Sequence, residues 1–237
     1  TVPDAAAVAQ WIGQERGWRA NISVARRGWK RKLLALARAN AEEALARSLT
    51  ELTSPASITK ALEDIARVLH LPEPPRRLEC YDISNIQGTL PTASMVVFVN
   101  GKPVPSEYRK FHLTLPEQPN DVAMMREVLS RRFSHLRTAR GIKEWPLPDV
   151  ILLDGGRGQL NAGRAVLADL NIDRPMAALA KREEELFVPG TLRPLLLPRE
   201  SPALYLLQRL RDEAHRFTLG YHRLLRKKRM TKSLLED

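Results

Sequence analysis

The stretch DVILLDGGRGQL, residues 149–160, carries most of the information about the fold. Residues 149–153 form a short, almost wholly apolar run, which is typical of a strand buried on both faces of a sheet. The run ends in the carboxylate of Asp154, glycine occupies three of the next four positions, and residues 159–170 have the composition of a helix. A buried strand, a sharp turn and a helix form the repeating unit of α/β proteins, which place ligand sites at the carboxyl ends of their strands.

The glycine-rich turn after Asp154 allows three interpretations. It could cradle a phosphate, but GGRGQ lacks the Lys-Ser/Thr ending of a P-loop and the spacing of GxGxxG. It could be a plain strand-to-helix turn in which Asp154 caps the helix. It could also leave the rim of the sheet uncrowded, so that the carboxylate of Asp154 can bind a cation. This stretch alone leaves all three open.

A second aspartate stands in a similar place. Residues 78–83 are predicted to form a strand, and Asp82 lies near its end, ahead of a turn that contains glycine. Two aspartates on neighbouring strands could hold Mg²⁺ or Mn²⁺ through their oxygen atoms. Such a cation neutralises phosphate charge and lowers the pKa of bound water, which is the chemistry of phosphodiester hydrolysis.

Two further residues are candidates for the same site. His215, in RDEAHRF, lies beside the apolar stripe of a predicted helix and could point toward the rim of the sheet. There it could bind metal or transfer a proton, although a half-buried histidine bonded to the backbone fits the pattern as well. Asp121 lies near the start of another predicted helix and could add a carboxylate to the site. Interaction with the helix dipole would also explain Asp121.

The rest of the chain predicts a mixed α/β sheet flanked by helices. Residues 93–99 should form a strand closed by the turn Asn100-Gly101, with residues 108–113 as its partner. Further elements are expected as a helix at 121–133, a strand at 176–180, and a helix from Ser201-Pro202 to about 219.

The N-terminal part has a different character. Residues 1–69 look mostly helical, with a possible short strand at 18–24 and a Ser54-Pro55 cap opening a helix. Three prolines within 70–78 indicate an extended linker. We therefore expect a helical N-terminal region with its linker at 1–74 and an α/β domain at 75–237.

Composition narrows the class of protein. The longest apolar runs are only a few residues, too short to span a bilayer, and the first residues do not form a secretory signal. A single cysteine, Cys80, permits no internal disulfide, which fits a reducing cytoplasm. The net charge of +11 indicates a polyanionic partner such as nucleic acid, although a basic protein without that role has the same charge.

Clusters of basic residues along the sequence are candidates for phosphate contacts, which give affinity without sequence specificity. They are Arg109, Lys110, Arg131, Arg132, Arg216, Arg223, Arg226, Lys227, Lys228 and Arg229.

Five motifs, in this order, resemble the C-terminal endonuclease half of the UvrC family of bacterial nucleotide-excision repair. They are ECYDISNIQG, SEYRKFHL, NDVAMMREVLSRRF, PDVILLDGGRGQL and SPALYLLQRLRDEAHRF, and the likeness is strong over residues 75–237. The resemblance implies an RNase H-like fold and metal-dependent cutting of the damaged strand on the 5′ side of a lesion. It implies catalytic roles for Asp82, Asp154 and His215, and an additional role for Asp121. Asn85 and Asn120 depart from the family pattern, which commonly has histidine and aspartate there.

The resemblance also implies partners. Damaged double-stranded DNA would be the substrate, and a complex of UvrB with DNA would be met through other regions of the full-length protein. No membrane and no small-molecule substrate are expected. The sequence shows neither the nuclease domain that makes the 3′ cut nor the tandem helix-hairpin-helix region, so we expect it to be the 5′-incision module of a longer protein.

Two other functions remain to be weighed. One is a non-catalytic DNA-binding scaffold with an RNase H-like fold, which failure to bind Mn²⁺ would favour. The other is a nucleotide-dependent phosphotransferase that uses the glycine-rich turn, which measurable ATP binding would favour.

Overall fold

The computed structural model describes residues 5–18, 22, 27–84, 92–113, 121–134, 145–181 and 183–236. Within these ranges the backbone alone is described at Asp121 and Val122 and at 221–236, among others. Contacts divide the chain into two compact units, Thr1–Glu51 and Leu52–Asp237. This differs from the expected boundary after residue 74, because the helix at 55–68 packs with the second unit. The expected strand at 18–24 lies largely outside the described residues.

The first unit contains helices α1 (Ala5–Arg16) and most of α2 (Gly28–Leu52). Helix α2 is rich in strong helix formers, and its Arg38 and Glu42 form an ion pair of 2.8 Å one turn apart. No helix in the described parts of the chain is both long and apolar enough to cross a membrane.

The second unit is built on a seven-stranded mixed sheet with the strand order β3-β2-β1-β5-β6-β7, in which β4 also pairs with β2. Strands β1, β5 and β6 are parallel, and the remaining pairings are antiparallel. The strands are β1 (Arg77–Ser84), β2 (Thr92–Val99), β3 (Lys102–Pro103), β4 (Arg109–His112), β5 (Val150–Asp154), β6 (Met176–Ala180) and β7 (Glu185–Phe187). The predicted fold class is confirmed.

The turn that closes β2 behaves as its sequence predicts. Asn100 and Gly101 have φ values of 49° and 70°. A type I′ hairpin turn requires a positive φ at both of its central residues. The strand directly across this turn is the short β3, however. Strand β4 follows a 3₁₀ turn at Pro105–Glu107 and pairs with the first half of β2.

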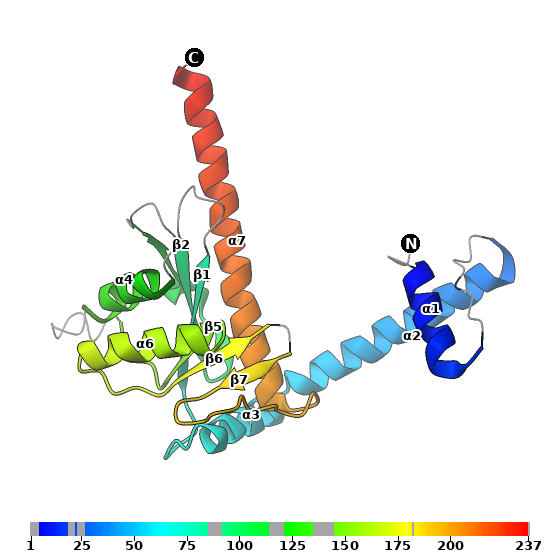
Figure 1. Ribbon diagram of the computed structural model, residues 1–237, viewed down its shortest axis with the longest axis horizontal. Coiled ribbons are helices and arrows are strands. Elements are labelled where there is room, and N and C mark those ends of the chain that lie inside the picture. The colour runs from blue at the N-terminus through cyan, green and yellow to red at the C-terminus, as the bar shows by residue number, and fades with distance from the viewer. Residues whose placement is uncertain are drawn as a thin grey trace. The chain divides into compact units, whose positions relative to one another are not determined.

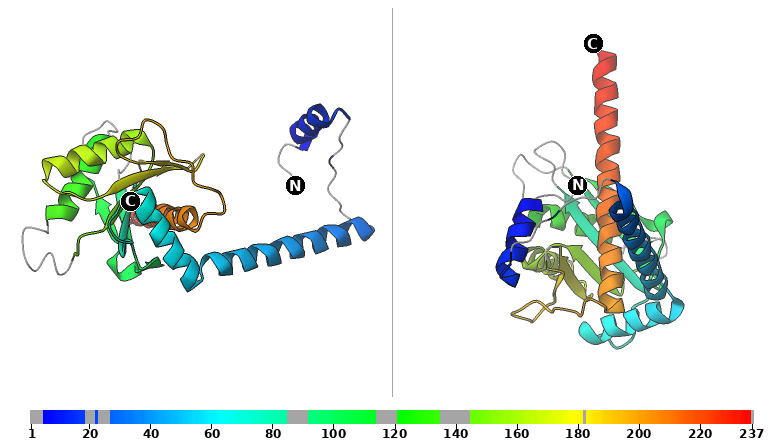
Figure 2. Two further views of the ribbon diagram at one scale, coloured as in Figure 1. Left: turned by 90° about the horizontal axis from the view of Figure 1, so that it is seen from below. Right: turned by 90° about the vertical axis from the view of Figure 1, so that its right-hand side faces the viewer.

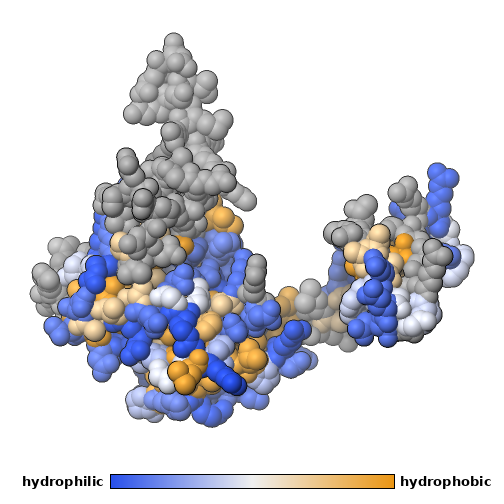
Figure 3. All heavy atoms as spheres, viewed as in Figure 1, coloured by the Kyte–Doolittle hydropathy of each residue, from blue (hydrophilic) through white to orange (hydrophobic). Residues whose placement is uncertain are grey.

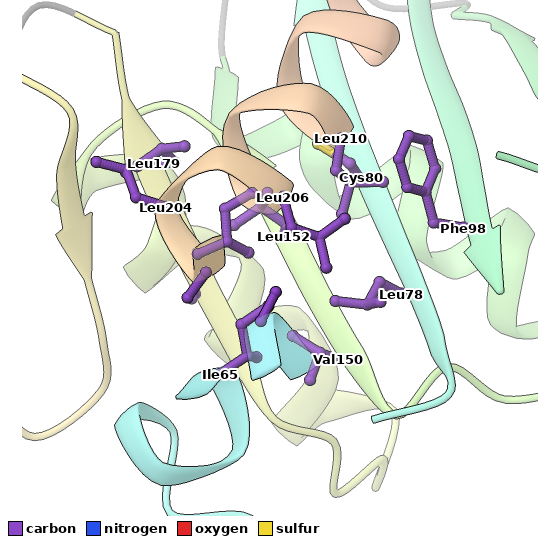
Figure 4. Packing of buried hydrophobic residues seen from close by; sticks show 14 of the residues in the cluster. Ile65, Leu78, Cys80, Phe98, Val150, Leu152, Leu179, Leu204, Leu206 and Leu210 are labelled. Carbon is purple, nitrogen blue, oxygen red and sulfur yellow. The ribbon is translucent and has the colours of Figure 1, made fainter. Parts of the chain in front are cut away.

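Helices cover both faces of the sheet (Figures 1 and 2). Helices α3 (Pro55–Val68) and α7 (Pro202–Glu236) pack on one face, and α4 (Asp121–Ser134) and α6 (Arg157–Asp169) pack on the other. Ser54 caps α3 by accepting a hydrogen bond from the backbone of Ser57, as Ser-Pro predicts. Figure 4 shows Leu204, Leu206 and Leu210 of α7 lying against the sheet.

The apolar residues of each parallel strand alternate between these two faces. In β1, Leu78 and Cys80 belong to the core under α7, whereas Tyr81 belongs to the core under α4 and α6. In β5, Val150 and Leu152 likewise lie under α7. Asp82 and Asp154 each lie two residues after a residue of this core, so they also face α7.

A buried charge network lies on the opposite face. The carboxylate of Glu79, which is 0% exposed, accepts hydrogen bonds from Arg77, Tyr81 and Arg132. Arg132 is also 0% exposed, and it donates to the carbonyl oxygens of Trp145 and Pro146. This network links β1 to the C-terminal turn of α4.

The surface of the second unit is mainly hydrophilic on the side shown in Figure 3, with apolar side chains between the polar ones. Arg126 of α4 and Asp169 of α6 form an ion pair of 2.7 Å, with both side chains about half exposed. An exposed pair of this kind contributes little to stability.

Candidate active site

Two carboxylates meet where the parallel strands β1 and β5 end. The register of these strands pairs Tyr81 with Leu153, so one further residue brings Asp82 beside Asp154. Both side chains face α7, by the alternation described above. The strand ends therefore supply two adjacent oxygen donors, as the sequence predicts.

An imidazole from α7 completes the cluster. Nδ1 of His215 lies 3.5 Å from Oδ2 of Asp82 and 3.9 Å from Oδ2 of Asp154. Helix α7 is anchored beside the cluster by Ser94, which pairs with Asp82 across β1 and β2. The Ser94 hydroxyl donates to the carbonyl oxygen of Ala214 and bonds to the hydroxyl of Thr218 at 2.7 Å.

The electrostatics of this cluster are unfavourable without a cation. Oδ2 of Asp82 is buried and has no hydrogen-bond partner among the described residues. Burial and, after it, repulsion from Asp82 raise the pKa of Asp154 to about 6. The cations that oppose this shift are Arg211, His215 and Lys181. A buried unpaired oxygen beside a second carboxylate is costly, and a bound cation would remove that cost.

The three side chains fit a divalent cation. Each offers one ligand atom, and these atoms all lie within 4.8 Å of one another. Oxygen ligands on opposite sides of one Mg²⁺ are ~4.2 Å apart, twice a bond of ~2.1 Å, so small side-chain movements would close the site. Two carboxylates and one imidazole can hold a divalent cation through two oxygen atoms and one nitrogen.

The raised pKa of Asp154 predicts how the stability of the metal-free protein depends on pH. The folded state holds this proton more tightly than the unfolded state, so folding is favoured at low pH and loses stability as pH rises from about 4 to 6. Between pH 5 and 7 we expect a loss of about 1 kcal/mol from this group. Denaturant unfolding in EDTA at both pH values should show this loss in the wild type and not in Asp154→Asn. An equal pH dependence in both proteins would contradict the assignment.

The glycine-rich turn is a strand-to-helix connection. Helix α6 begins after Gly156, and the amide of Gly156 donates to the side chain of Gln159 at 3.1 Å. Asp154 does not cap α6, because no side chain accepts at that N-cap. Arg157 donates to the carbonyl oxygens of Thr191 and Leu192 and stacks on Phe187. The turn thus leaves the carboxylate of Asp154 available to the cluster.

The candidate DNA-binding residues lie in different parts of the structure. Lys110 lies over the ring of Phe217 on the α7 face, and Arg216 of α7 is exposed and paired with Glu213. Arg109, its neighbour in β4, instead stacks on Trp145 beside Arg132. Arg131 of α4 is partly exposed and pairs with Glu127.

One of these assignments is corrected. Arg132 is fully buried and its guanidinium is held by Glu79, so it is a core residue and offers no surface charge to DNA. The side chains of five others, and that of Asp121, lie outside the described residues: Arg223, Arg226, Lys227, Lys228 and Arg229. The backbone places Asp121 at the first residue of α4.

Sequence reasoning missed a second set of charges near the cluster. Arg211, one turn before His215 on α7, is 3% exposed and binds Glu184 with both terminal nitrogens. Glu184 ends the turn between β6 and β7, which Lys181 begins. The signal was available, since Lys181 follows the apolar strand 176–180 just as Asp154 follows 150–153.

A mixed sheet between two helical layers, with carboxylates at adjacent strand ends facing an imidazole, defines an α/β protein with a candidate metal centre at its carboxyl edge. The family model described as the UvrC RNAse H endonuclease domain matches residues 66–219. Another, described as the UvrC Ribonuclease H-like domain, matches residues 1–48. The chain belongs to the UvrC family.

Individual relatives agree with this family. The UvrABC system protein C of Moorella thermoacetica is 45% identical over 240 residues, which cover 99% of this chain and 38% of that protein. That of Synechococcus sp. (strain JA-3-3Ab) is 46% identical over 241 residues, or 100% of this chain and 37% of the relative. The chain thus spans less than half the length of these relatives. Among solved structures, human ENDOV is 17% identical with a TM-score of 0.38, covering 63% of this chain and 85% of that one.

Proposed function

We propose that the second unit is a metal-dependent DNA endonuclease that makes the 5′ incision beside a lesion in nucleotide-excision repair. The observation that carries this proposal is the convergence of Asp82, Asp154 and His215 within 4.8 Å at the carboxyl edge of the sheet. Membership of the UvrC family supports it, since the matching family model is that of an endonuclease domain.

Each residue of the cluster has a role in this proposal. Asp82 and Asp154 would hold Mg²⁺ or Mn²⁺, which supplies charge neutralisation at the phosphate and a lowered pKa of water. The side chain of His215 is 39% exposed, so solvent can reach its imidazole. It would act as a third ligand or as the group that moves a proton. In-line attack by water would leave a 3′-hydroxyl and a 5′-phosphate.

The DNA would lie along the face that carries α7. Lys110 and Arg216, the latter paired with Glu213, are exposed on this face, and α7 continues to Glu236 through the basic segment 223–229. Cations spaced along one face bind phosphates irrespective of sequence, which suits a nuclease that acts beside lesions. The partner that delivers the lesion would be a complex of UvrB with DNA, reached through other parts of the full-length protein.

The direct test combines metal binding with incision. Titration of the protein with Mn²⁺ should show binding that is lost in Asp154→Ala. The reconstituted repair complex should nick a lesion-bearing duplex on the 5′ side only when Mg²⁺ or Mn²⁺ is present. A protein that binds DNA but neither Mn²⁺ nor Mg²⁺ would be a non-catalytic scaffold, and the proposal would fail.

A further inference from the structure

The turn between β6 and β7 brings a lysine to the same edge of the sheet as the metal cluster. Strands β1, β5 and β6 lie side by side, and each contributes two residues of the core under α7, two positions apart. The residue two positions further on is charged in all three cases: Asp82 in β1, Asp154 at the end of β5, and Lys181 directly after β6. The preceding core residues are Leu78 and Cys80, Val150 and Leu152, and Ala177 and Leu179.

The register fixes how far Lys181 stands from the carboxylates. Asp154 pairs with Leu179 across β5 and β6, so Lys181 lies two residues beyond this level. At ~3.3 Å per residue this is a displacement of ~7 Å past the rim, which the four-carbon lysine stem can span. The positive charge of Lys181 acts to lower the pKa of Asp154, whereas burial and the charge of Asp82 raise it.

The turn that carries Lys181 is held to the helix that carries His215. Glu184, three residues later, accepts from both terminal nitrogens of Arg211 at 2.6 and 3.3 Å. Arg211 is one helical turn before His215 and is almost completely buried. This ion pair ties the end of the turn at Glu184 to the helix that carries His215.

Charge balance shows what this lysine could do. A divalent cation would offset the two carboxylates, but a phosphodiester brings one more negative charge, and its transition state develops further charge. Arg211 cannot neutralise this additional charge, because its guanidinium already donates hydrogen bonds to Glu184 and Asp212. Lys181 is exposed, and it has no hydrogen bond or ion pair to any residue that the structure describes.

We propose that Lys181 is a further catalytic residue, whose ammonium contacts a non-bridging oxygen of the phosphate being cut. This inference rests on the proposed function. Because Lys181 touches the substrate and not the metal, its loss should slow cutting without weakening metal binding.

The test compares Lys181→Ala and Lys181→Arg with Lys60→Ala, which removes another exposed lysine, from α3, the helix beneath the opposite ends of the strands. In single-turnover nicking with Mn²⁺, Lys181→Ala should be roughly 10²-fold slower than wild type. Lys181→Arg should recover part of the rate because it keeps the charge. Lys60→Ala should stay within about twofold, and no variant should bind Mn²⁺ more weakly than the wild type.

A second measurement does not depend on cutting. DNA affinity is measured against salt concentration, with Ca²⁺ replacing Mn²⁺ and the DNA verified to remain uncut. Loss of one phosphate contact should reduce the magnitude of the log–log slope by about 0.9 for Lys181→Ala and leave it unchanged for Lys60→Ala. An unchanged slope, an unchanged nicking rate, or weakened Mn²⁺ binding by Lys181→Ala would each overturn the proposal. A wild type that never nicks would refute the proposed function, while the slope would still decide whether Lys181 meets a phosphate.

Discussion

Asp82→Asn is expected to reduce 5′ nicking by about 10³-fold or more, which corresponds to a barrier increase of at least ~4 kcal/mol. The amide keeps the shape of the carboxylate but removes the negative charge that a divalent cation requires. His215→Ala should lose nicking as well, because the imidazole is the third member of the cluster. Single-turnover nicking of a lesion-bearing duplex in the complete repair complex provides the measurement.

Asp82→Asn should be at least as stable as the wild type when no metal is bound. In the wild type, Oδ2 of Asp82 is buried without a hydrogen-bond partner among the described residues, beside the carboxylate of Asp154. Neutralising one of the two removes this repulsion, so the free energy of unfolding in EDTA should not fall. Asp169→Asn, which alters an exposed carboxylate on α6, is the matched control and should nick at the wild-type rate. Wild-type nicking by Asp82→Asn would refute the assigned site.

Glu79→Ala is expected to lower the free energy of unfolding by about 3–5 kcal/mol. It would leave the buried guanidinium of Arg132 without its carboxylate and would also remove a partner of Arg77. Small domains are stable by only about 5–15 kcal/mol, so a large part of the total would be lost. Denaturant unfolding followed by circular dichroism measures the change.

Two further variants distinguish the effect of the buried charges from other causes of destabilisation. Arg126→Ala breaks an exposed ion pair and should cost no more than about 1 kcal/mol. The double variant Glu79→Gln with Arg132→Met removes the two fully buried charges and leaves Arg77 paired with Glu107, so it should be less destabilised than Glu79→Ala alone. If Glu79→Ala unfolded like Arg126→Ala, the network would not be a major source of stability.

The buried network also explains why sequence reasoning misplaced Arg132. Arg131 and Arg132 are adjacent basic residues, and the sequence offers no reason to separate them. Consecutive residues of a helix point ~100° apart, so one arginine faces solvent and the other enters the core. Glu79, more than fifty residues earlier, makes burial of Arg132 possible. Such a partnership depends on packing between distant segments.

The domain boundary expected after residue 74 also depended on packing between distant segments. The prolines at 72–75 lie in the short connection between α3 and β1, which is neither helix nor strand. They do not separate two domains, because Ile58, Leu62 and Ile65 of α3 pack into the core beneath α7. The apolar stripe of α3 was evident from helical periodicity, but the surface that it covers was not.

The sequence by itself determined the parallel strands, the turn at Asn100-Gly101, and the two carboxylates at strand ends. These depend on short-range patterns: a period of two in a strand and the conformational freedom of particular residues in a turn. It also determined the family, through motifs in a fixed order.

Only the tertiary structure decided which distant groups meet. It brought the imidazole of His215 within 3.5 Å of Asp82, tied Arg211 to Glu184, and set Lys181 at the same edge of the sheet. These contacts depend on strand order and on how α7 is seated by Ser94 and Thr218. Local propensity carries no information about them, because each joins segments whose separation along the chain is bridged only when the whole core packs.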